Sequence, residues 1–329
     1  MVKFQGISLA YINEQGDIKT ECYGFSDKEN NVRVDENTIF PAASMSKFIT
    51  SICVLKLHDK KVLDINDPVN KYLNKWKLRL LNDEESNVTI KSILNHTGGI
   101  IDGDDSFYGI RLDDAQIDIM DILEGKTSYN KRYTKVENSP GTEFIYSDAG
   151  YCILQLLIEE VTNKSFEEFV CETIFRVLKL DNAFYATHIN FQLYEKKKHL
   201  TVGYDNNIPI KGKYIPCPDL ASSGLWISPK EMVIIAKEFF KSINGKSDLL
   251  SYEAANLMIK PLEKFPGVGL GLFISEDNIL ITQGWAENAQ CMMKIDLTKE
   301  RISIVMTNGN PGINQVESGI EEMVNKYLL

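Results

Sequence analysis

The sequence has 329 residues, of which 43% are hydrophobic and 25% are charged, and its formal net charge is −10. A chain of this length can bury one large core or two closely joined subdomains. Nucleic-acid-binding proteins usually present a basic face, so this acidic balance excludes nucleic acid as an expected partner. No apolar run approaches the roughly 20 residues that cross a bilayer, so we expect no membrane span.

The amino terminus and the cysteines bear on the compartment. Met1–Leu9 has no charged region followed by a long apolar core, so no signal peptide is expected. Cys53, Cys152 and Cys171 lie in apolar helical patterns, and none of the six cysteines forms a C-x-x-C pair. We interpret them as small buried hydrophobic residues rather than disulfides or metal ligands. This usage fits a reducing compartment better than an oxidising one.

The first third of the chain is predicted to form two strands and a helix. Gly6–Ile12 and Ile18–Phe25 are strand-like and flank a polar turn at Asn13–Asp17. A helix is predicted from about Ser44 to His58, and because it is apolar on nearly every side it should lie in the core. Asp64–Val69 indicates a turn with a helix start, where proline is tolerated in the first turn.

Residues from about 70 to 200 are predicted to be mostly helices and loops. Helical spacing is clear in Tyr151–Thr162 and Ser165–Leu178. A further helix, Ser228–Phe240, begins with a capping serine and a proline in its first turn.

The last third is predicted to consist of strands followed by a closing helix at Asn314–Leu328. The expected strands are Val268–Ser275, Asn278–Thr282, Ala289–Asp296 and Ile302–Thr307. The predicted fold is therefore α+β, an α/β/α sandwich with one antiparallel sheet built from both chain ends and flanked by helices. We expect a single domain over 1–329, with a sheet subdomain at 1–60 and 220–329 and an inserted, mostly helical subdomain at 61–219.

The first chemical element is the stretch Phe40–Lys47, which places the Ser44 hydroxyl and the Lys47 amine three residues apart at a helix start. Residues three apart share a helical face, so Lys47 should point its amine at the Ser44 oxygen. A neighbouring base is what activates a serine as a nucleophile. The spacing alone is also compatible with an ordinary helix cap, and a second copy, Ser128–Lys131, lies in a polar loop.

Two further elements could complete a site. Tyr146 stands at a turn before an apolar helix, where its hydroxyl could face a nucleophile or simply pack in the core. A nearby lysine cation would ease the loss of its proton. Ile281–Trp285 ends an apolar strand, whose backbone N–H groups could stabilise an oxyanion and whose Gly284 permits close approach of a substrate. A plain strand-to-loop turn is the alternative.

These three elements, in this order and spacing, resemble the serine β-lactamase and penicillin-binding-protein superfamily. The closest likeness is to its class C β-lactamase, D-Ala-D-Ala carboxypeptidase and esterase branch. The resemblance covers nearly the whole chain and includes Gly24–Asp27, Asn37–Phe40, Ser92–Gly99, Gly141–Phe144, Ser223–Trp226 and Gly269–Leu272. The fold of that family, an antiparallel sheet flanked by helices with an all-helical region beside it, agrees with the predicted layout. Members of that family are often exported, so the sequence does not decide in which compartment this protein lies.

The resemblance implies a role for each matching residue. Ser44 would be the nucleophile, and Lys47 and Tyr146 would share the base and acid work. The backbone N–H groups of Ser44 and Trp285 would form the oxyanion hole. The implied protein is a serine hydrolase that acts without a cofactor on a small-molecule or peptide acyl substrate, through an acyl-enzyme. Lys47 must spend time neutral to act as a base, and burial would lower its pKa.

Asp148 departs from the family pattern. The second motif of the family usually ends in asparagine, whose amide both donates and accepts hydrogen bonds, whereas an ionised Asp148 only accepts. It could accept a substrate N–H, or it could pair with Lys47 and hold that amine charged. The second arrangement would weaken Lys47 as a base.

Thr282 is a second departure, because the third motif usually begins with lysine or histidine. A register shifted by one residue would place Gln283 there, which is uncharged as well. The family cation contacts a substrate carboxylate, and losing a charged hydrogen bond costs about 1.5–3 kcal/mol. We therefore expect weak β-lactam hydrolysis and a preference for a neutral ester or amide, or for a peptide bound by other contacts.

Three alternatives complete the sequence reading. His96 is interpreted as a hydrogen-bonded structural residue rather than a base. The four histidines are far apart and show no paired spacing, so no catalytic metal is expected. A catalytically silent penicillin-binding or sensor-like protein that keeps the fold is the rival to an active hydrolase.

Overall fold

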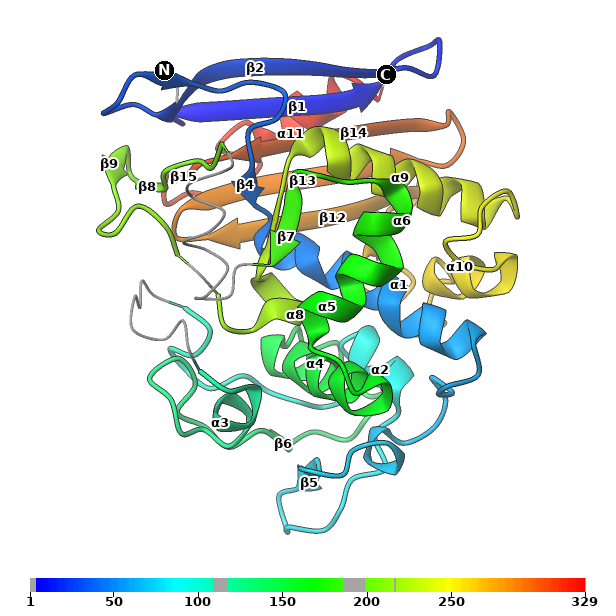
Figure 1. Cartoon of the computed structure of the whole chain (residues 1–329). Coiled ribbons are helices and arrows are strands. Elements are labelled where there is room, and N and C mark those ends of the chain that lie inside the picture. Colours follow the sequence, from blue (N-terminus) through cyan, green and yellow to red (C-terminus); the bar gives the residue numbers. More distant parts are fainter. Residues whose placement is uncertain (1–3, 109–116, 186–198, 216, 329) are drawn as a thin grey trace.

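The computed structural model describes residues 4–108, 117–185, 199–215 and 217–328. Its main feature is an antiparallel seven-stranded sheet in the order β11-β12-β13-β14-β1-β2-β3 (Figure 1). The strands are β1 (Gly6–Ile12), β2 (Ile18–Asp27), β3 (Val32–Arg33), β11 (Phe273–Ile274), β12 (Ile279–Ala286), β13 (Ala289–Asp296) and β14 (Arg301–Thr307). The two chain ends thus meet where β1 pairs with β14, which confirms the predicted α+β fold.

Helices cover both faces of this sheet. α11 (Ile320–Asn325) packs on β13 and β14, whereas α9 (Pro229–Ile243) packs on β1, β2 and β14 from the other side (Figure 1). Successive strand residues point to opposite faces. Ile304 of β14 accordingly joins the main core, while its neighbour Val305 packs in the smaller cluster around α11. Apolar residues on both faces of the central strands therefore fix a helix–sheet–helix arrangement.

The rest of the described chain contains further helices and very short strands, which turns and loops connect. The helical segments are η1 (Ala43–Met45), α1 (Ser46–Asp59), η2 (Val69–Lys71), α2 (Ile90–Leu94), α3 (Ile119–Leu123), α4 (Asp148–Thr162), α5 (Phe166–Val170), the π-helical η4 (Cys171–Phe175), α6 (Arg176–Leu178), α8 (Leu220–Ser223) and α10 (Tyr252–Met258). The short strands are β4 (Phe40–Pro41), β5 (Arg79–Leu80), β6 (Lys135–Val136), β7 (Ala183–Tyr185), β8 (Tyr204–Asp205), β9 (Ile208–Pro209), β10 (Leu225–Ile227) and β15 (Gly309–Asn310).

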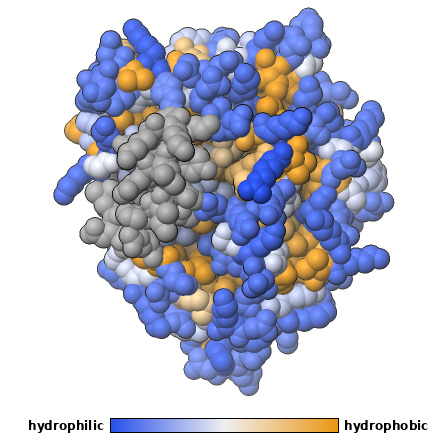
Figure 2. All heavy atoms as spheres, in the orientation of Figure 1, coloured by the Kyte–Doolittle hydropathy of each residue, from blue (hydrophilic) through white to orange (hydrophobic). Residues whose placement is uncertain are grey.

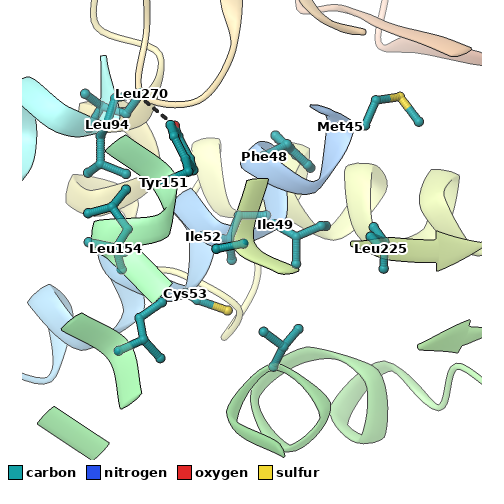
Figure 3. Close-up of a cluster of buried hydrophobic side chains, with 14 of the residues drawn as sticks. Met45, Phe48, Ile49, Ile52, Cys53, Leu94, Tyr151, Leu154, Leu225 and Leu270 are labelled. Carbon is teal, nitrogen blue, oxygen red and sulfur yellow. Dashed lines mark hydrogen bonds between the residues drawn. The ribbon is translucent and has the colours of Figure 1, made fainter. Parts of the chain in front are cut away.

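α1 is the central helix of the core. Figure 3 shows Phe48, Ile49 and Ile52 of α1 among side chains from other elements, including Leu154 of α4 and Leu225 of β10. A helix that is apolar on nearly every side has to be buried, and the prediction for this helix is confirmed. Its dense surroundings hold its amino-terminal end, and with it the first chemical motif, in one place.

The predicted strand at Val268–Ser275 is mostly wrong. The described strand covers only Phe273–Ile274, and Val268 forms an isolated bridge with Phe273. Gly271 explains the difference, because its φ of +72° turns the chain back on itself before the strand can form.

The predicted closing helix at Asn314–Leu328 is too long, since α11 covers only Ile320–Asn325. A separate turn precedes it, in which the Ser318 N–H donates to the Asn314 carbonyl. Gly319, with a φ of +89°, separates that turn from the helix.

The cysteines and the surface complete the description. All six cysteines are free, and Cys53 and Cys152 are buried as predicted, whereas Cys171 is only half-buried. On the face shown in Figure 2, hydrophilic side chains cover most of the surface outside the grey residues. Within the described ranges, every helix is too short or too polar to cross a membrane.

Candidate active site

Ser44 lies in the tight turn η1, directly before α1. Ala43 precedes it with a φ of +46°, a left-handed conformation that costs a residue with a side chain roughly 1 kcal/mol. Hydrogen bonds hold this turn: the Ser46 hydroxyl donates to the Ala43 carbonyl (2.7 Å) and accepts from the Leu225 N–H (3.1 Å). The surrounding structure thus maintains a strained turn that presents the Ser44 hydroxyl.

Lys47 lies one helical turn further and is 2% exposed. Its Nζ donates to Ser44 Oγ at 3.2 Å, as the spacing predicts, and to Asp148 Oδ1 at 2.6 Å. It also donates to the hydroxyl and carbonyl oxygens of Ser222, at 2.7 and 3.2 Å. The Ser222 hydroxyl in turn donates to Asp148 Oδ1. Asp148 therefore pairs with Lys47, which is the second of the two arrangements considered from the sequence.

The pairing corrects the expectation that Lys47 has a lowered pKa. Burial is the largest influence and lowers that pKa, but the negative charge of Asp148, with further contributions from Tyr146, outweighs it. The net result is a raised pKa, so the amine is charged at neutral pH. Burial disfavours the charged form of Asp148 too and so raises its pKa. The Lys47 cation and the hydrogen bonds from Lys47 and Ser222 outweigh burial, and the net pKa of Asp148 is lowered. The two groups form a buried ion pair.

Tyr146 stands beside this pair, two residues before α4 begins. Lys47 Nζ lies 4.8 Å from the centre of the Tyr146 ring, and the residue is 39% exposed. Desolvation of the hydroxyl and, to a smaller extent, the negative charge of Asp148 raise its pKa, and together they outweigh the Lys47 charge and the hydrogen bonding with Lys47 and Ser44, which lower it. The expected effect of the lysine is thus present, but the net pKa is raised and the phenol keeps its proton at neutral pH.

His96 packs against the ring of Tyr146. Its ring stacks on the Tyr146 ring at a centroid distance of 4.4 Å, and its Nδ1 accepts the Ser147 N–H at 3.1 Å. Burial and the Lys47 charge lower the pKa of His96 to about 3, so the imidazole is neutral. These contacts agree with the structural role expected for His96.

Asp102 was not predicted from the sequence and anchors the amino terminus of α4. Its carboxylate accepts the Ser147 hydroxyl (2.7 Å), the Asp148 N–H (2.7 Å) and the Ala149 N–H (3.1 Å). A carboxylate at a helix amino terminus satisfies N–H groups that have no partner within the helix. Asp102 thereby fixes the turn that presents both Tyr146 and Asp148. It stands three residues after the Ser92–Gly99 stretch, which is the sequence signal that could have marked it.

Gly284 of β12 packs directly against the serine turn. A Cβ atom there would lie 2.3 Å from the Ala42 carbonyl oxygen and 2.6 Å from Cys291 Sγ, so only glycine fits. The Cys291 thiol donates to the same Ala42 carbonyl at 3.1 Å. The strand and the turn are thus in close contact, and Trp285 and Ser44 line one cavity.

The other residues of the third motif alternate across the sheet. Thr282 is 6% exposed and shares the inner side of β12 with Gly284, whereas Gln283 and Trp285 place their side chains on the outer side, where both line a second pocket. The indole Nε1 of Trp285 donates to Asn310 Oδ1 at 3.1 Å. Of the predicted residues, Gln283 therefore does not line the cavity beside the serine, whereas Trp285 does.

The cavity beside Ser44 is small, about 60 Å³, which is room for a few waters or a small acyl group. Carboxylates and aromatic rings contribute much of its lining, including Asp148, Glu287, Phe107, Tyr129 and Trp285. The described lining residues include no lysine or arginine. In the part of the chain that the structure describes, no group of three or more His, Cys, Asp or Glu side chains is placed to hold a metal ion.

The chain matches the beta-lactamase family over residues 1–324, and it belongs to that family. Protein flp from Staphylococcus aureus (strain NCTC 8325 / PS 47) is 27% identical over 241 residues, which cover 71% of this chain and 43% of that protein. Teichoic acid D-alanine hydrolase from Staphylococcus aureus is 29% identical over 197 residues, 60% of this chain and 44% of that protein. The chain thus spans less than half the length of these curated relatives.

Solved structures show the same fold. The octameric penicillin-binding protein homologue from Pyrococcus abyssi superposes with a TM-score of 0.79 at 21% identity, over 98% of this chain and 74% of that one. D-amino acid amidase from Ochrobactrum anthropi SV3, complexed with L-phenylalanine, gives a TM-score of 0.80 at 19% identity, over 99% and 92% of the two chains.

Proposed function

We propose that this protein is a serine hydrolase that cleaves an ester or amide through an acyl-enzyme on Ser44. The observation that carries the proposal is the 3.2 Å contact between Lys47 Nζ and Ser44 Oγ in a site that also holds Tyr146. Two of the similar proteins are named a D-alanine hydrolase and a D-amino acid amidase, which supports a hydrolytic reaction on an acyl bond.

The reaction follows from the groups around Ser44. Ser44 Oγ attacks the substrate carbonyl carbon, and its proton passes to a base while the carbonyl oxygen gains negative charge. The N–H groups of Ser44 and Trp285 are the expected donors to that oxygen. The protonated base then gives its proton to the leaving group. Water next attacks the acyl carbon and passes its proton to the base, and the base returns a proton to Ser44 Oγ as the acid product leaves.

Tyr146 is the better candidate for the base. The Asp148 carboxylate holds Lys47 charged, so Lys47 has no free electron pair with which to accept the Ser44 proton. The same cation stabilises a Tyr146 phenolate, which can accept it. In this scheme Lys47 works as a cation between Ser44 and Tyr146, and Asp148 keeps it so.

The charges around the cavity support a substrate without a carboxylate. Thr282 stands at the motif position where the family carries the cation that contacts a substrate carboxylate. Glu287 adds a carboxylate to the cavity wall, whereas Lys47 balances the charge of Asp148, and the described lining therefore favours a neutral or positively charged acyl group. We therefore favour a small aminoacyl ester or amide with a free amine over a β-lactam.

Steady-state kinetics on three substrates test this proposal: the p-nitrophenyl ester of D-alanine, its N-acetylated form and nitrocefin, with Ser44→Ala as the control. We expect kcat/KM to be highest for the free-amine ester and lowest for nitrocefin, and Ser44→Ala to abolish all turnover. Intact mass after a fluorophosphonate should show one adduct that Ser44→Ala lacks. Efficient nitrocefin turnover would overturn the substrate assignment, and the absence of any adduct would overturn the reaction.

A second candidate is a catalytically silent penicillin-binding or sensor-like protein. The Lys47–Asp148 ion pair favours it, because a charged lysine cannot serve as a base for deacylation. A penicillin adduct on Ser44 that persists for hours, without ester turnover, would support this candidate over the hydrolase.

A further inference from the structure

Gln315 connects the carboxy-terminal segment to the strand pair beside Ser44. It is 6% exposed and lies between β15 and α11. Its side-chain Nε2 donates to the Gly284 carbonyl oxygen at 2.8 Å and to the Cys291 carbonyl oxygen at 2.9 Å. Gly284 and Cys291 face each other in the register of β12 and β13. Both hydrogens of one buried amide thus bind two carbonyl groups of this strand pair.

The Gly284 carbonyl belongs to the same peptide unit as the Trp285 N–H, which is the expected oxyanion donor. A trans peptide is planar, and its C=O and N–H point in opposite directions. Gln315 and the Cys291 thiol (3.7 Å) both approach the carbonyl from the β13 side. The N–H of Trp285 is therefore directed to the opposite edge of β12, where the pairing with β11 has already ended at Ile281.

A donor on the carbonyl oxygen changes the N–H of the same peptide in two ways. It draws electron density toward the oxygen, which makes the N–H a stronger donor, because hydrogen bonds in a chain polarise one another. It also resists rotation of the peptide plane, so the N–H stays aimed where negative charge develops. Preorganised donors of this kind stabilise an oxyanion most when they need no reorganisation during the reaction.

We propose that Gln315 is a positioning residue for the oxyanion hole: its buried amide holds the Gly284–Trp285 peptide so that the Trp285 N–H faces the substrate carbonyl at Ser44. This role deepens the proposed function and rests on it for the acylation step. Gln315 touches no substrate, and it acts from the far face of the sheet through one peptide group.

The chain offers a matched control in Gln290. This residue is fully buried, its Nε2 donates to the Ile313 carbonyl at 2.6 Å, and its Oε1 accepts the Ser318 hydroxyl at 2.7 Å. Gln290 therefore anchors the same segment as Gln315 and lies opposite Trp285 in the register of β12 and β13, but in the described residues its side chain makes no hydrogen bond to the Gly284 carbonyl. Equal loosening of the segment is expected from Gln290→Met and Gln315→Met, whereas only the second removes the donor from the oxyanion peptide.

Two measurements on the full chain test the proposal. The first is the amide resonance of Trp285 in ¹⁵N–¹H spectra of the free protein, which reports the polarisation of its peptide and needs no reaction. The second is the acylation rate of Ser44 by p-nitrophenyl acetate, followed as a burst of p-nitrophenol. Gln315→Leu provides a second variant of similar size, since its side chain has no hydrogen-bond donor. It serves if the methionine substitution prevents folding.

In Gln315→Met we expect the Trp285 amide proton to shift upfield and acylation to slow about tenfold with KM within twofold of wild type, because removing a whole oxyanion donor costs about 10²–10³ in rate. Gln290→Met should keep both readouts near wild type. An unmoved Trp285 resonance with unchanged acylation, or equal losses in the two methionine variants, would overturn the proposal. If the unsubstituted protein forms no Ser44 adduct, the proposed function fails, and the amide resonance still decides the role of Gln315.

Discussion

Lys47 and Asp148, which are 101 residues apart in the sequence, form an ion pair of 2.6 Å in the interior of the molecule. Their side chains are 3% and 20% exposed. Removing one partner of such a pair leaves the other charge buried and costs about 3–5 kcal/mol unless the remaining group becomes neutral. The pair therefore determines both the stability of the site and the charge state of the only amine that contacts Ser44 in the described residues.

The first prediction concerns the pH profile of the unsubstituted protein. The pKa values of Lys47 and Tyr146 are both raised, so whichever group accepts the Ser44 proton is mostly protonated at pH 7. The active fraction then grows with pH, and log kcat/KM for an uncharged p-nitrophenyl ester should rise by about one per pH unit between pH 7 and 9. Initial rates corrected for spontaneous hydrolysis measure this slope. A plateau already reached at pH 7 would contradict the assignment of the charge states.

The second prediction concerns Asp148→Asn, which removes the counter-charge from Lys47. The loss of the Asp148 charge removes a cause that raises the pKa of Tyr146, and burial then lowers the pKa of Lys47. Whichever of the two groups is the base therefore becomes available at a lower pH. We expect the rising limb of the pH profile to move toward neutral pH and kcat/KM at pH 7 to increase severalfold. Asp118→Asn, which changes an exposed carboxylate that caps α3, is the control and should leave the profile in place. A uniform loss of activity with an unmoved profile would argue that Asp148 itself takes part in proton transfer.

The sequence could predict the contact between Ser44 and Lys47, because the two residues are three positions apart across the turn that leads into α1, and local geometry decides their distance. It could not predict Ser222, which reaches Lys47 from 175 residues away. Ser222 lies in α8, a four-residue helix whose sequence shows no periodicity. Contacts of this kind depend on how separate elements pack, and a single sequence carries no local signal for them.

Burial alone predicted a lowered pKa for Lys47, whereas its pairing with Asp148, which raises that pKa, was one of two arrangements that the sequence left open. Burial of the helix could be inferred from its apolar residues, but the counter-charge comes from α4, which is distant in the sequence. The sheet was easier to predict than the pKa of Lys47. Apolar strands at both chain ends can bury their side chains in few ways other than by pairing into one sheet that helices cover. The errors there fell on Val268–Ser275 and Asn314–Leu328, where one glycine in a left-handed conformation interrupts each predicted element.

The third prediction uses Gly284→Ala to test the contact between β12 and the serine turn. The added methyl group would lie 2.3 Å from the Ala42 carbonyl oxygen, so strand and turn must separate. Overpacking of this kind costs about 1–3 kcal/mol, and the Trp285 N–H moves away from Ser44. We expect kcat/KM for the ester to fall at least tenfold and the urea unfolding midpoint to decrease.

Gly267→Ala is the matched control for this change. Its nearest neighbour would be the Ile274 carbonyl oxygen at 3.6 Å, an ordinary contact, and its φ is not in the left-handed region. We expect it to keep both activity and stability near wild type. Similar activity in the two alanine variants would show that the packing of Gly284 does not position the site.

The last prediction concerns Asp219, a fully buried carboxyl group directly before α8. Its Oδ1 accepts the Tyr129 hydroxyl at 2.8 Å, but its Oδ2 has no hydrogen-bond partner among the described residues. Burial, with a smaller contribution from the Asp148 charge, raises the pKa of Asp219 to about 7. The folded-state pKa lies above the unfolded value of 3.8, so the fold favours the protonated form of Asp219. The contribution of this group to stability is therefore complete below pH 3.8 and is lost as the pH rises to 7.

Asp219→Asn should therefore stabilise the protein in a pH-dependent manner. Each pH unit between the two pKa values corresponds to ~1.4 kcal/mol, and the unpaired amide that replaces the carboxylate offsets about 1–3 kcal/mol of the gain. We expect the variant to be about 2 kcal/mol more stable than wild type at pH 8, with the difference vanishing or reversing near pH 5. Urea unfolding of both proteins at the two pH values measures this, with Asp118→Asn as the exposed control. A stability difference that stays constant between pH 5 and 8 would show that Asp219 does not titrate in this range.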